Sequence, residues 1–248
     1  MYLVILLPSL LALFALYKKK ITNGGIIAAW LMGIIITYVG GLYAFSALAS
    51  TFLLTILSDK IKRHHRDEKR NIYQIISNVL TATMALVIYS FKGEEIFIVM
   101  YYAVLAGSLS DTLASSIGSL SRHRSFNPVT FKRMRKGESG AISTLGLSAT
   151  LLGGLVIGGI YYLNGGDVTN YLIIIIMGVI GAYLDSIMGA FVQGKYKCSK
   201  CKEVVETNSH CGKKTKLVRG LVFVNNDVVN LLSNIFVFII TYIIMILK

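Results

Sequence analysis

Long apolar runs alternate with short basic segments along the whole chain. A helix needs about 20 apolar residues to cross the hydrocarbon core of a bilayer, and most of the runs approach that length. They lie near residues 2–17, 25–39, 42–57, 71–90, 95–118, 140–163, 170–193 and 220–246. The pattern predicts an all-α, polytopic integral membrane helix bundle with about eight transmembrane helices, in a single domain over residues 1–248.

The second and third runs are shorter than the others. We expect them to form either two separate spans or one re-entrant pair or tight hairpin that turns at Gly40 and Gly41.

Composition narrows the class of protein further. Hydrophobic residues make up 54% of the 248 residues, charged residues make up 15%, and the mean hydropathy is +0.66. These values exclude a disordered chain and disfavour an ordinary soluble domain. The net charge of +13 would suggest nucleic acid as the partner of a soluble protein. Here nearly all Lys and Arg residues lie in short connections between apolar runs, so no nucleic-acid partner is expected and the bilayer is the surrounding medium.

The positions of the basic residues predict the topology. They gather at Lys18–Lys20 and in loops near 58–70, 119–139 and 194–219. With eight spans, all four basic segments fall on one side of the membrane, and the positive-inside rule places them in the cytosol and both termini outside. We therefore expect a multi-pass protein of the cell membrane with its active site facing the cytoplasm. The first run precedes its basic residues, so it is expected to be an uncleaved anchor.

Three acidic residues lie inside apolar runs, namely Asp111, Asp185 and Asp227. An ionisable group in a span costs several kcal/mol unless it is paired or hydrated, so it marks a candidate functional site. Each of the three is expected to lie roughly 10–14 Å below the cytosolic end of its helix. Three carboxylates at one level would form a site for a hard cation such as Mg²⁺. The alternative is three unrelated structural residues, each bonded to a neighbouring helix.

Further polar residues share helix faces with these acids at i, i+3, i+4 and i+7 spacing. The candidate groups for orienting ligands or phosphates are Gln74, Asn78, Thr112, Ser115, Asn226 and Asn230. Small and amide side chains also join membrane helices to one another, which is the structural alternative for part of this set.

The third basic loop ends in a short glycine-containing segment. Glycines around small polar residues let backbone N–H groups approach phosphate oxygens, and cations precede them here. The candidate phosphate-binding residues of this loop are Asn127, Lys132, Lys136, Gly137, Glu138, Ser139 and Gly140. A topology-determining loop beside an anionic membrane surface is the alternative.

The three cysteines and one histidine of the last basic loop form a possible zinc site. Cys198 and Cys201 are separated by two residues, and His210 is followed directly by Cys211. A Cys₃His set suits tetrahedral, structural Zn²⁺. Adjacent side chains seldom share one metal, so free thiols are the alternative, and a stable disulfide is not expected in the cytosol.

Four segments of the chain together resemble the motifs of one family. They are the Arg70-Asn71-x-x-Gln74-x-x-x-Asn78 run, the run from Asp111-Thr112 to Gly118, the run from Lys136 to Ser143, and the run from Asn225 to Asn230. In this order they are similar to the family of transmembrane protein 19 and the plant phytyl-phosphate kinase. Ser116 stands where the family often has Glu, and Glu138 is the candidate replacement.

The resemblance implies a kinase that converts a polyprenyl or phytyl monophosphate, an isoprenoid monophosphate, into the diphosphate. The donor would be CTP or another nucleoside triphosphate, and the cofactor Mg²⁺. Phosphoryl transfer depends mainly on metal ions and cationic clamps. Asp111 and Asp227 would be the main metal ligands, with Asp185 as a ligand or a partner of one. The expected clamp residues are Arg70, Lys132 and Lys136.

Two other functions stay open from the sequence. A cytidylyltransferase that forms a CDP-lipid would need the same metal site and a different acceptor. An ion-coupled transporter of lipids or solutes also carries intramembrane carboxylates, usually near the midplane between repeats.

Overall fold

The computed structural model describes residues 2–61 and 69–248, and most of these residues are helical. The helices are α1 (Tyr2–Lys18), α2 (Asn23–Ile61), α3 (Ile72–Lys92), α4 (Glu95–Gly118), α5 (Thr144–Leu163), α6 (Val168–Phe191) and α7 (Asn226–Leu247). Within the described ranges, six are long and apolar enough to cross a membrane, and α1 is a shorter apolar helix. The predicted all-α membrane bundle is confirmed.

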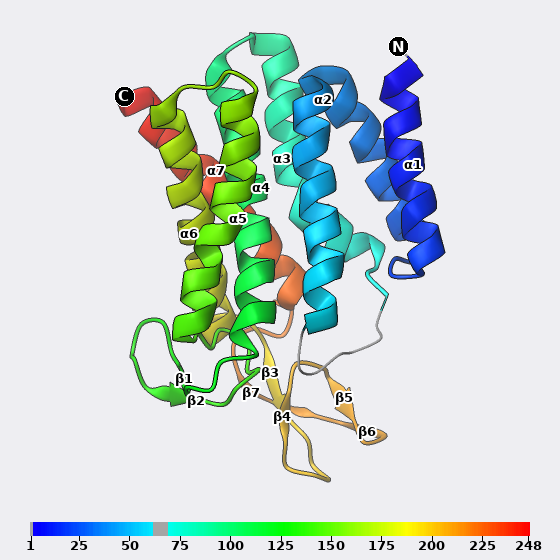
Figure 1. Cartoon of the computed structure of the whole chain (residues 1–248). Helices are drawn as coiled ribbons and strands as arrows, with labels where there is room; N and C mark the ends of the chain where they lie inside the picture. The colour runs from blue at the N-terminus through cyan, green and yellow to red at the C-terminus, as the bar shows by residue number, and fades with distance from the viewer. Residues whose placement is uncertain (1, 62–68) are drawn as a thin grey trace.

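Helix α2 is two antiparallel helices joined at Gly41. This residue has φ 71° and ψ −163°, a combination that only glycine adopts readily. Residues from both halves of α2 line one pocket, and Figure 1 shows the chain reversing at the end of the bundle near the N-terminus. The chain therefore turns tightly at Gly41, and the two halves of α2 correspond to the second and third predicted runs.

Replacing Gly41 by Ala is expected to cost about 1–3 kcal/mol of folding free energy. A Cβ at this position has no atom within 4 Å, so the cost comes from backbone strain alone. The matched control is Gly159→Ala in α5, where a Cβ also meets nothing and the backbone is helical. That control should be neutral or slightly stabilising. Unfolding of both variants in mixed micelles measures the difference, and equal stabilities would contradict the strained hairpin.

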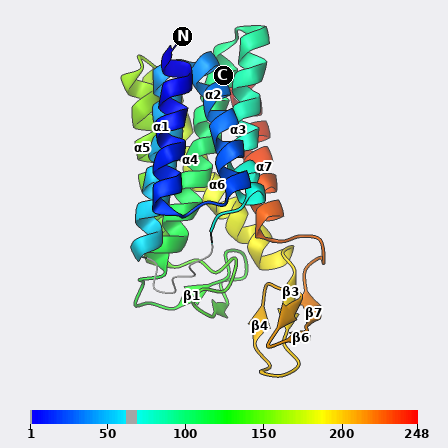
Figure 2. The same ribbon diagram turned by 90° about the vertical axis from the view of Figure 1, so that its right-hand side faces the viewer.

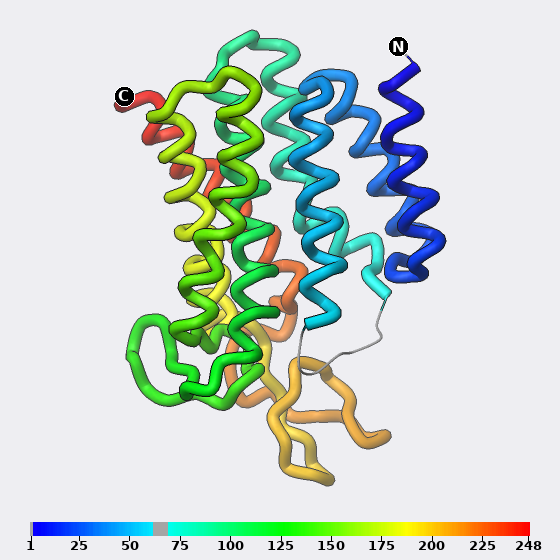
Figure 3. Tube along the Cα trace, in the orientation of Figure 1, coloured from blue at the N-terminus to red at the C-terminus, as the bar shows by residue number. Residues whose placement is uncertain are grey.

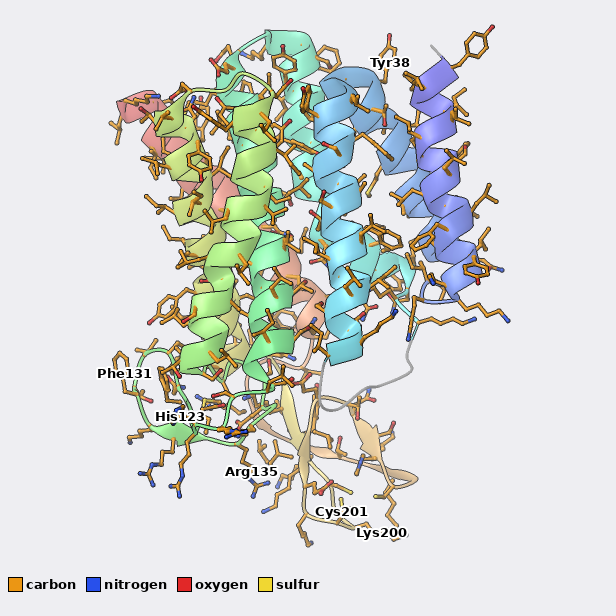
Figure 4. All side chains as sticks on the ribbon, in the orientation of Figure 1. Tyr38, His123, Phe131, Arg135, Lys200 and Cys201 are labelled. Atoms are coloured by element: carbon orange, nitrogen blue, oxygen red, sulfur yellow. The ribbon has the colours of Figure 1, made fainter. Side chains whose placement is uncertain are left out.

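All the described basic connections lie at one end of the bundle. Figures 1 and 2 show both termini at one end and the strands at the other. In Figure 4, Tyr38 lies near the termini, whereas His123, Arg135 and Cys201 lie at the opposite end. We call the end formed by residues 119–143 and 192–225 the basic end. Residues 62–68 of the expected loop 58–70 are outside the described residues.

Two predicted helix starts are wrong by several residues. Helix α5 begins at Thr144 instead of near 140, and α7 begins at Asn226 instead of near 220. Ser143 and Asn225 each cap the helix that follows, and their side-chain oxygens accept hydrogen bonds from the Gly146 and Val228 amides at 3.1 and 3.0 Å. The two basic loops are therefore longer than expected.

These loops form short strands that the apolar pattern did not predict. One pair is β1 (Ser125–Phe126) with β2 (Arg133–Met134). The others, in the connection between α6 and α7, are β3 (Lys195–Lys197), β4 (Val204–Val205), β5 (Ser209–His210), β6 (Lys213–Lys214) and β7 (Lys216–Arg219). Strand β3 lies between β4 and β7, and β5 pairs with β6. We call residues 195–219 the ribbon, which extends away from the helices in Figure 3.

Helix α4 runs through the centre of the bundle, and its residues from Val99 to Leu109 are almost completely buried. Small residues let its neighbours approach closely. A Cβ on Gly181 of α6 would lie 2.7 Å from the Gly107 Cα of α4, so the two backbones are in contact there. This contact fixes the register between α4 and α6.

Candidate functional site

Asp111 and Asp185 form a carboxylate pair between α4 and α6. Each lies four residues, or one helical turn, beyond the glycine contact of its helix, so the two are at the same level on facing sides. Their charges interact, which agrees with this placement. The Ser233 hydroxyl of α7 donates a hydrogen bond of 3.3 Å to Asp185 Oδ2. Three helices therefore meet at the pair.

Asp227 does not lie at this level, which corrects the expected depth. Because α7 begins at Asn226, Asp227 is in its first turn and is half-buried. Seven residues further on, Asn234 meets Ser108, so Asp227 is level with Ser115, about 6 Å nearer the basic end than Asp111. In the described residues, the only group of three or more Cys, His, Asp or Glu ligand atoms within 4.8 Å is in the ribbon. The three-carboxylate site is therefore not assembled, and a pair takes its place.

A hydrogen-bond network lies next to the pair and joins α3, α4 and α7. The Ser108 hydroxyl is 3.0 Å from Asn234 Oδ1 and 3.2 Å from the Asn78 carbonyl oxygen. Asn234 Nδ2 donates to the Ser77 carbonyl at 2.9 Å. Asn234 is buried and was not among the candidates, although its place seven residues after Asp227 puts it on the same helix face.

The residues from Arg70 to Gln74 begin α3. Asn71 and Gln74 form a reciprocal capping box, with hydrogen bonds of 3.0 and 3.1 Å between side chains and backbone amides. The Arg70 guanidinium pairs with Asp59 at 3.2 Å. Its backbone also bonds to Lys20 and Thr22 in the α1–α2 connection. Arg70, Asn71 and Gln74 therefore have structural roles at the start of α3, and these roles account for part of the motif without any ligand.

The same motif lines a pocket enclosed by α1, both halves of α2, α3 and α4. Most of its lining is apolar, with Leu11, Trp30 and Phe45 as examples. Its polar lining groups include Arg70, Gln74, Asn78, Ser108 and Thr112. The pocket thus combines residues of the first and second motifs, which are about 40 residues apart in the chain.

The segment Gly137–Gly140 packs against the end of α6. Gly140 has φ 77°, and a Cβ there would lie 2.1 Å from the Ala190 nitrogen and 2.6 Å from the Ser186 carbonyl oxygen. Ser186 is next to Asp185 in the chain. The segment and the carboxylate pair are therefore neighbours along one helix.

Two residues at the α6–β3 junction fix this segment, and the sequence reading missed both. The Lys195 ammonium is buried and donates to Glu138 Oε1 at 2.9 Å and to the Ser139 carbonyl at 2.8 Å. The Ser139 hydroxyl donates to Gln193 Oε1. Gln193 Nε2 is buried and has no hydrogen-bond partner among the described residues. In the sequence, Lys195 is one of many loop cations and ends a run, Gly189–Lys195, that resembles a phosphate-binding loop by chance, so neither feature predicted this contact.

The remaining candidates are placed less centrally. Asn127 Oδ1 accepts from the Val129 and Thr130 amides and so shapes its own turn. Lys132 is exposed, and the Lys136 ammonium donates to the Ser121 carbonyl. Ser115 and Asn226 are exposed as well.

Asn230 is partly buried, and its backbone carbonyl accepts a hydrogen bond from the Ser233 hydroxyl at 3.0 Å, a contact that does not involve the Asn230 side chain. Glu138 and Ser116 make structural contacts with their side chains. Ser116, where the family often has Glu, donates to Ser58 of α2, and Glu138 is engaged by Lys195. No described contact brings Glu138 to the carboxylate pair as its replacement.

The Cys and His side chains of the ribbon form a second cluster, separate from the carboxylate pair. One ligand atom from each of Cys198, Cys201, His210 and Cys211 lies within 4.8 Å of the others. All three cysteines are free thiols. Hydrogen bonds, first from the Cys201 amide, lower the pKa of Cys198 to about 6.

Comparison with known proteins places the chain in a family. The model of the integral membrane protein family DUF92 matches residues 6–238. An uncharacterized membrane protein of Methanocaldococcus jannaschii is 30% identical over 197 residues, covering 77% of this chain and 82% of the relative. Protein PGR of Arabidopsis thaliana is 27% identical over 270 residues, covering 92% and 90%. No solved structure matches. The chain belongs to the DUF92 family of integral membrane proteins, and the family expected from its motifs is confirmed.

Proposed function

We propose that this protein transfers the terminal phosphoryl group of a nucleoside triphosphate to the phosphate of a polyprenyl-type lipid monophosphate. The observation that carries the proposal is the pocket whose mostly apolar wall also includes polar groups such as Arg70, Gln74 and Thr112. Such a lining suits a molecule with a charged head and a hydrocarbon tail. A purely polar substrate would leave most of the wall without a partner.

The position of Arg70 gives the lipid an orientation. Arg70 precedes α3 at the basic end, so the phosphate would lie there and the tail would extend among α1, α2 and α3. The ion pair with Asp59 engages the Nη2 atom of Arg70, and the guanidinium has further N–H groups for phosphate oxygens.

The carboxylate pair is suited to Mg²⁺. Its donors are all oxygens, from Asp111, Asp185 and the Ser233 hydroxyl. Mg²⁺ is commonly held by one or two carboxylates together with substrate phosphates, so a pair is sufficient. When bound there, the ion would neutralise charge on the phosphates during transfer. Asp227 lies about one turn nearer the basic end and would face the aqueous side of the site, where the nucleotide binds.

The segment Gly137–Gly140 is the candidate holder of the donor triphosphate. Its backbone is fixed by Lys195, and Gly140 packs against Ser186 and Ala190 of α6, the helix that carries Asp185. The unpaired Gln193 Nε2 is a further buried donor next to Ser139.

In the reaction, an oxygen of the lipid phosphate attacks the terminal phosphorus and forms the new P–O bond. The bond from that phosphorus to the bridging oxygen breaks, and the nucleoside diphosphate leaves with the electron pair. The attacking oxygen is already anionic near neutral pH, so no protein base is required.

A transfer assay tests the proposal directly. Purified protein receives Mg²⁺, a γ-labelled nucleoside triphosphate and farnesyl, geranylgeranyl or phytyl monophosphate. Label in a lipid diphosphate is the expected result. In a parallel reaction with α-labelled CTP, label in the lipid would instead identify a cytidylyltransferase. Absence of turnover together with ion-driven flux in liposomes would identify a transporter, and either result would overturn the kinase.

Narrowing the pocket is expected to discriminate between substrates by tail length. Ala12 of α1 lines the pocket, so Ala12→Phe should raise KM about tenfold or more for geranylgeranyl monophosphate and little for dimethylallyl monophosphate. Leu13 is 61% exposed on the outer face of the same helix, which makes Leu13→Phe the matched control. Equal effects of the two variants on both substrates would show that the tail binds elsewhere.

A further inference from the structure

The ribbon contains two short hairpins, β3–β4 and β5–β6, and each carries part of the Cys and His cluster. Cys198 follows β3 directly, and Cys201 lies in the turn before β4. His210 ends β5, and Cys211 begins the turn before β6. Two hairpin turns therefore bring together four side chains of the types that ligate zinc.

The distances between these side chains are close to those that one zinc ion requires. His210 Nδ1 is 3.4 Å from Cys201 Sγ and 3.3 Å from Cys211 Sγ. With ordinary Zn–S and Zn–N bond lengths and a tetrahedral angle, the S···N separation is about 3.6 Å. The buried Cys198 completes a set of four within 4.8 Å.

The backbone conformation answers the objection that His210 and Cys211 are adjacent. Cys211 has φ 52° and Gly212 has φ 72°, both in the left-handed region. This conformation is unusual for a non-glycine residue and lets both neighbouring side chains reach one point. Lys202, after the other turn, has φ 63°, and the Lys200 amide donates to Cys198 Sγ at 3.4 Å. The two turns are thus shaped around sulfur atoms.

Without a metal, the ribbon has few interactions that would stabilise its fold. Its apolar side chains are few, and Val204 and Val218 are about half exposed. Segments of this size usually need a metal or disulfides because they cannot bury enough apolar surface. The three thiols are not joined in disulfides.

We infer that Cys198, Cys201, His210 and Cys211 bind one structural Zn²⁺. Four protein ligands leave no open position, so the ion has no direct catalytic role. The metal would instead hold the ribbon in place. The first strand of the ribbon begins at Lys195, and the Lys195 ammonium bonds to Glu138 and to the Ser139 carbonyl. The ion would therefore help to position the segment Gly137–Gly140. The zinc site itself stands whether or not the protein is a kinase.

Metal analysis of the full-length protein in detergent tests the inference. Protein purified without chelator is expected to contain one zinc per chain, and X-ray absorption at the zinc edge should report three sulfur ligands and one nitrogen. Cys198→Ser and His210→Ala should lose the metal. His123→Ala, on the other basic loop, is the matched control and should retain it. Equal zinc content in all three variants, or wild-type protein that takes up no zinc when zinc is added, would overturn the site.

A second measurement covers the case in which the cysteine variant does not fold. Chelator applied to folded wild-type protein should release the zinc and expose residues 197–219 to protease, while the helical content stays unchanged. If chelation leaves the protease sensitivity of the ribbon as it was, the ion does not hold the ribbon together.

Discussion

Replacing Asp111 by Asn is expected to lower phosphoryl transfer by at least about 10³-fold while the protein stays folded. Metal stabilisation of the transition state is worth several kcal/mol, and each 1.4 kcal/mol, approximately, is a factor of ten in rate. The amide keeps the size of the side chain and removes its charge. Because the charges of Asp111 and Asp185 interact, the substitution also removes a repulsion, so thermal stability should rise or stay equal.

This opposite response of activity and stability distinguishes a functional carboxylate from a structural one. Asp167→Asn is the matched control, because Asp167 caps α6 at the other end of the bundle and pairs with Lys248. Asn also caps helices well, so that variant should keep both activity and fold. Full transfer activity in Asp111→Asn would remove the metal assignment, and a large loss of stability would assign Asp111 to packing.

Replacing Gly140 by Ala is expected to reduce transfer by about 10²-fold, the effect of displacing a substrate-holding segment by about 1 Å. The added Cβ would lie 2.1 Å from the Ala190 nitrogen, and backbone atoms cannot move aside as a flexible side chain can. The segment Gly137–Gly140 would then lift away from α6 and from the carboxylate pair. The loss should appear mainly as a higher KM for the nucleotide.

The chain provides a close control for this substitution in Gly137→Ala. Gly137 has the same φ of 77°, and a Cβ there meets nothing within 4 Å. Both variants carry a backbone cost of about 1 kcal/mol, and only Gly140→Ala carries the clash. Steady-state kinetics with varied nucleotide compares them. Similar KM values for the two variants would mean that packing of the segment against α6 does not contribute to nucleotide binding.

Several parts of the molecule could be predicted from local sequence. The apolar runs gave the helices, because a bilayer requires continuous hydrophobic stretches of a set length. The positions of the Lys and Arg residues predicted that the basic loops lie at one end of the bundle, and the described loops do lie at one end. The predicted depth of Asp227 was wrong because the apolar residues from Leu221 to Val224 resemble the first turn of its helix. The helix in fact begins after the Asn225 cap.

The sequence by itself determined the class of the protein, the helices and the residue types available for chemistry, because those depend on neighbours along the chain. Only the tertiary structure decided which of these residues meet. The register set by the contact of Gly107 with Gly181 pairs Asp111 with Asp185, and the reversal at Gly41 closes the pocket beside Arg70. Contacts between distant segments depend on how closely helices pack, and small side chains far apart in the chain control that jointly.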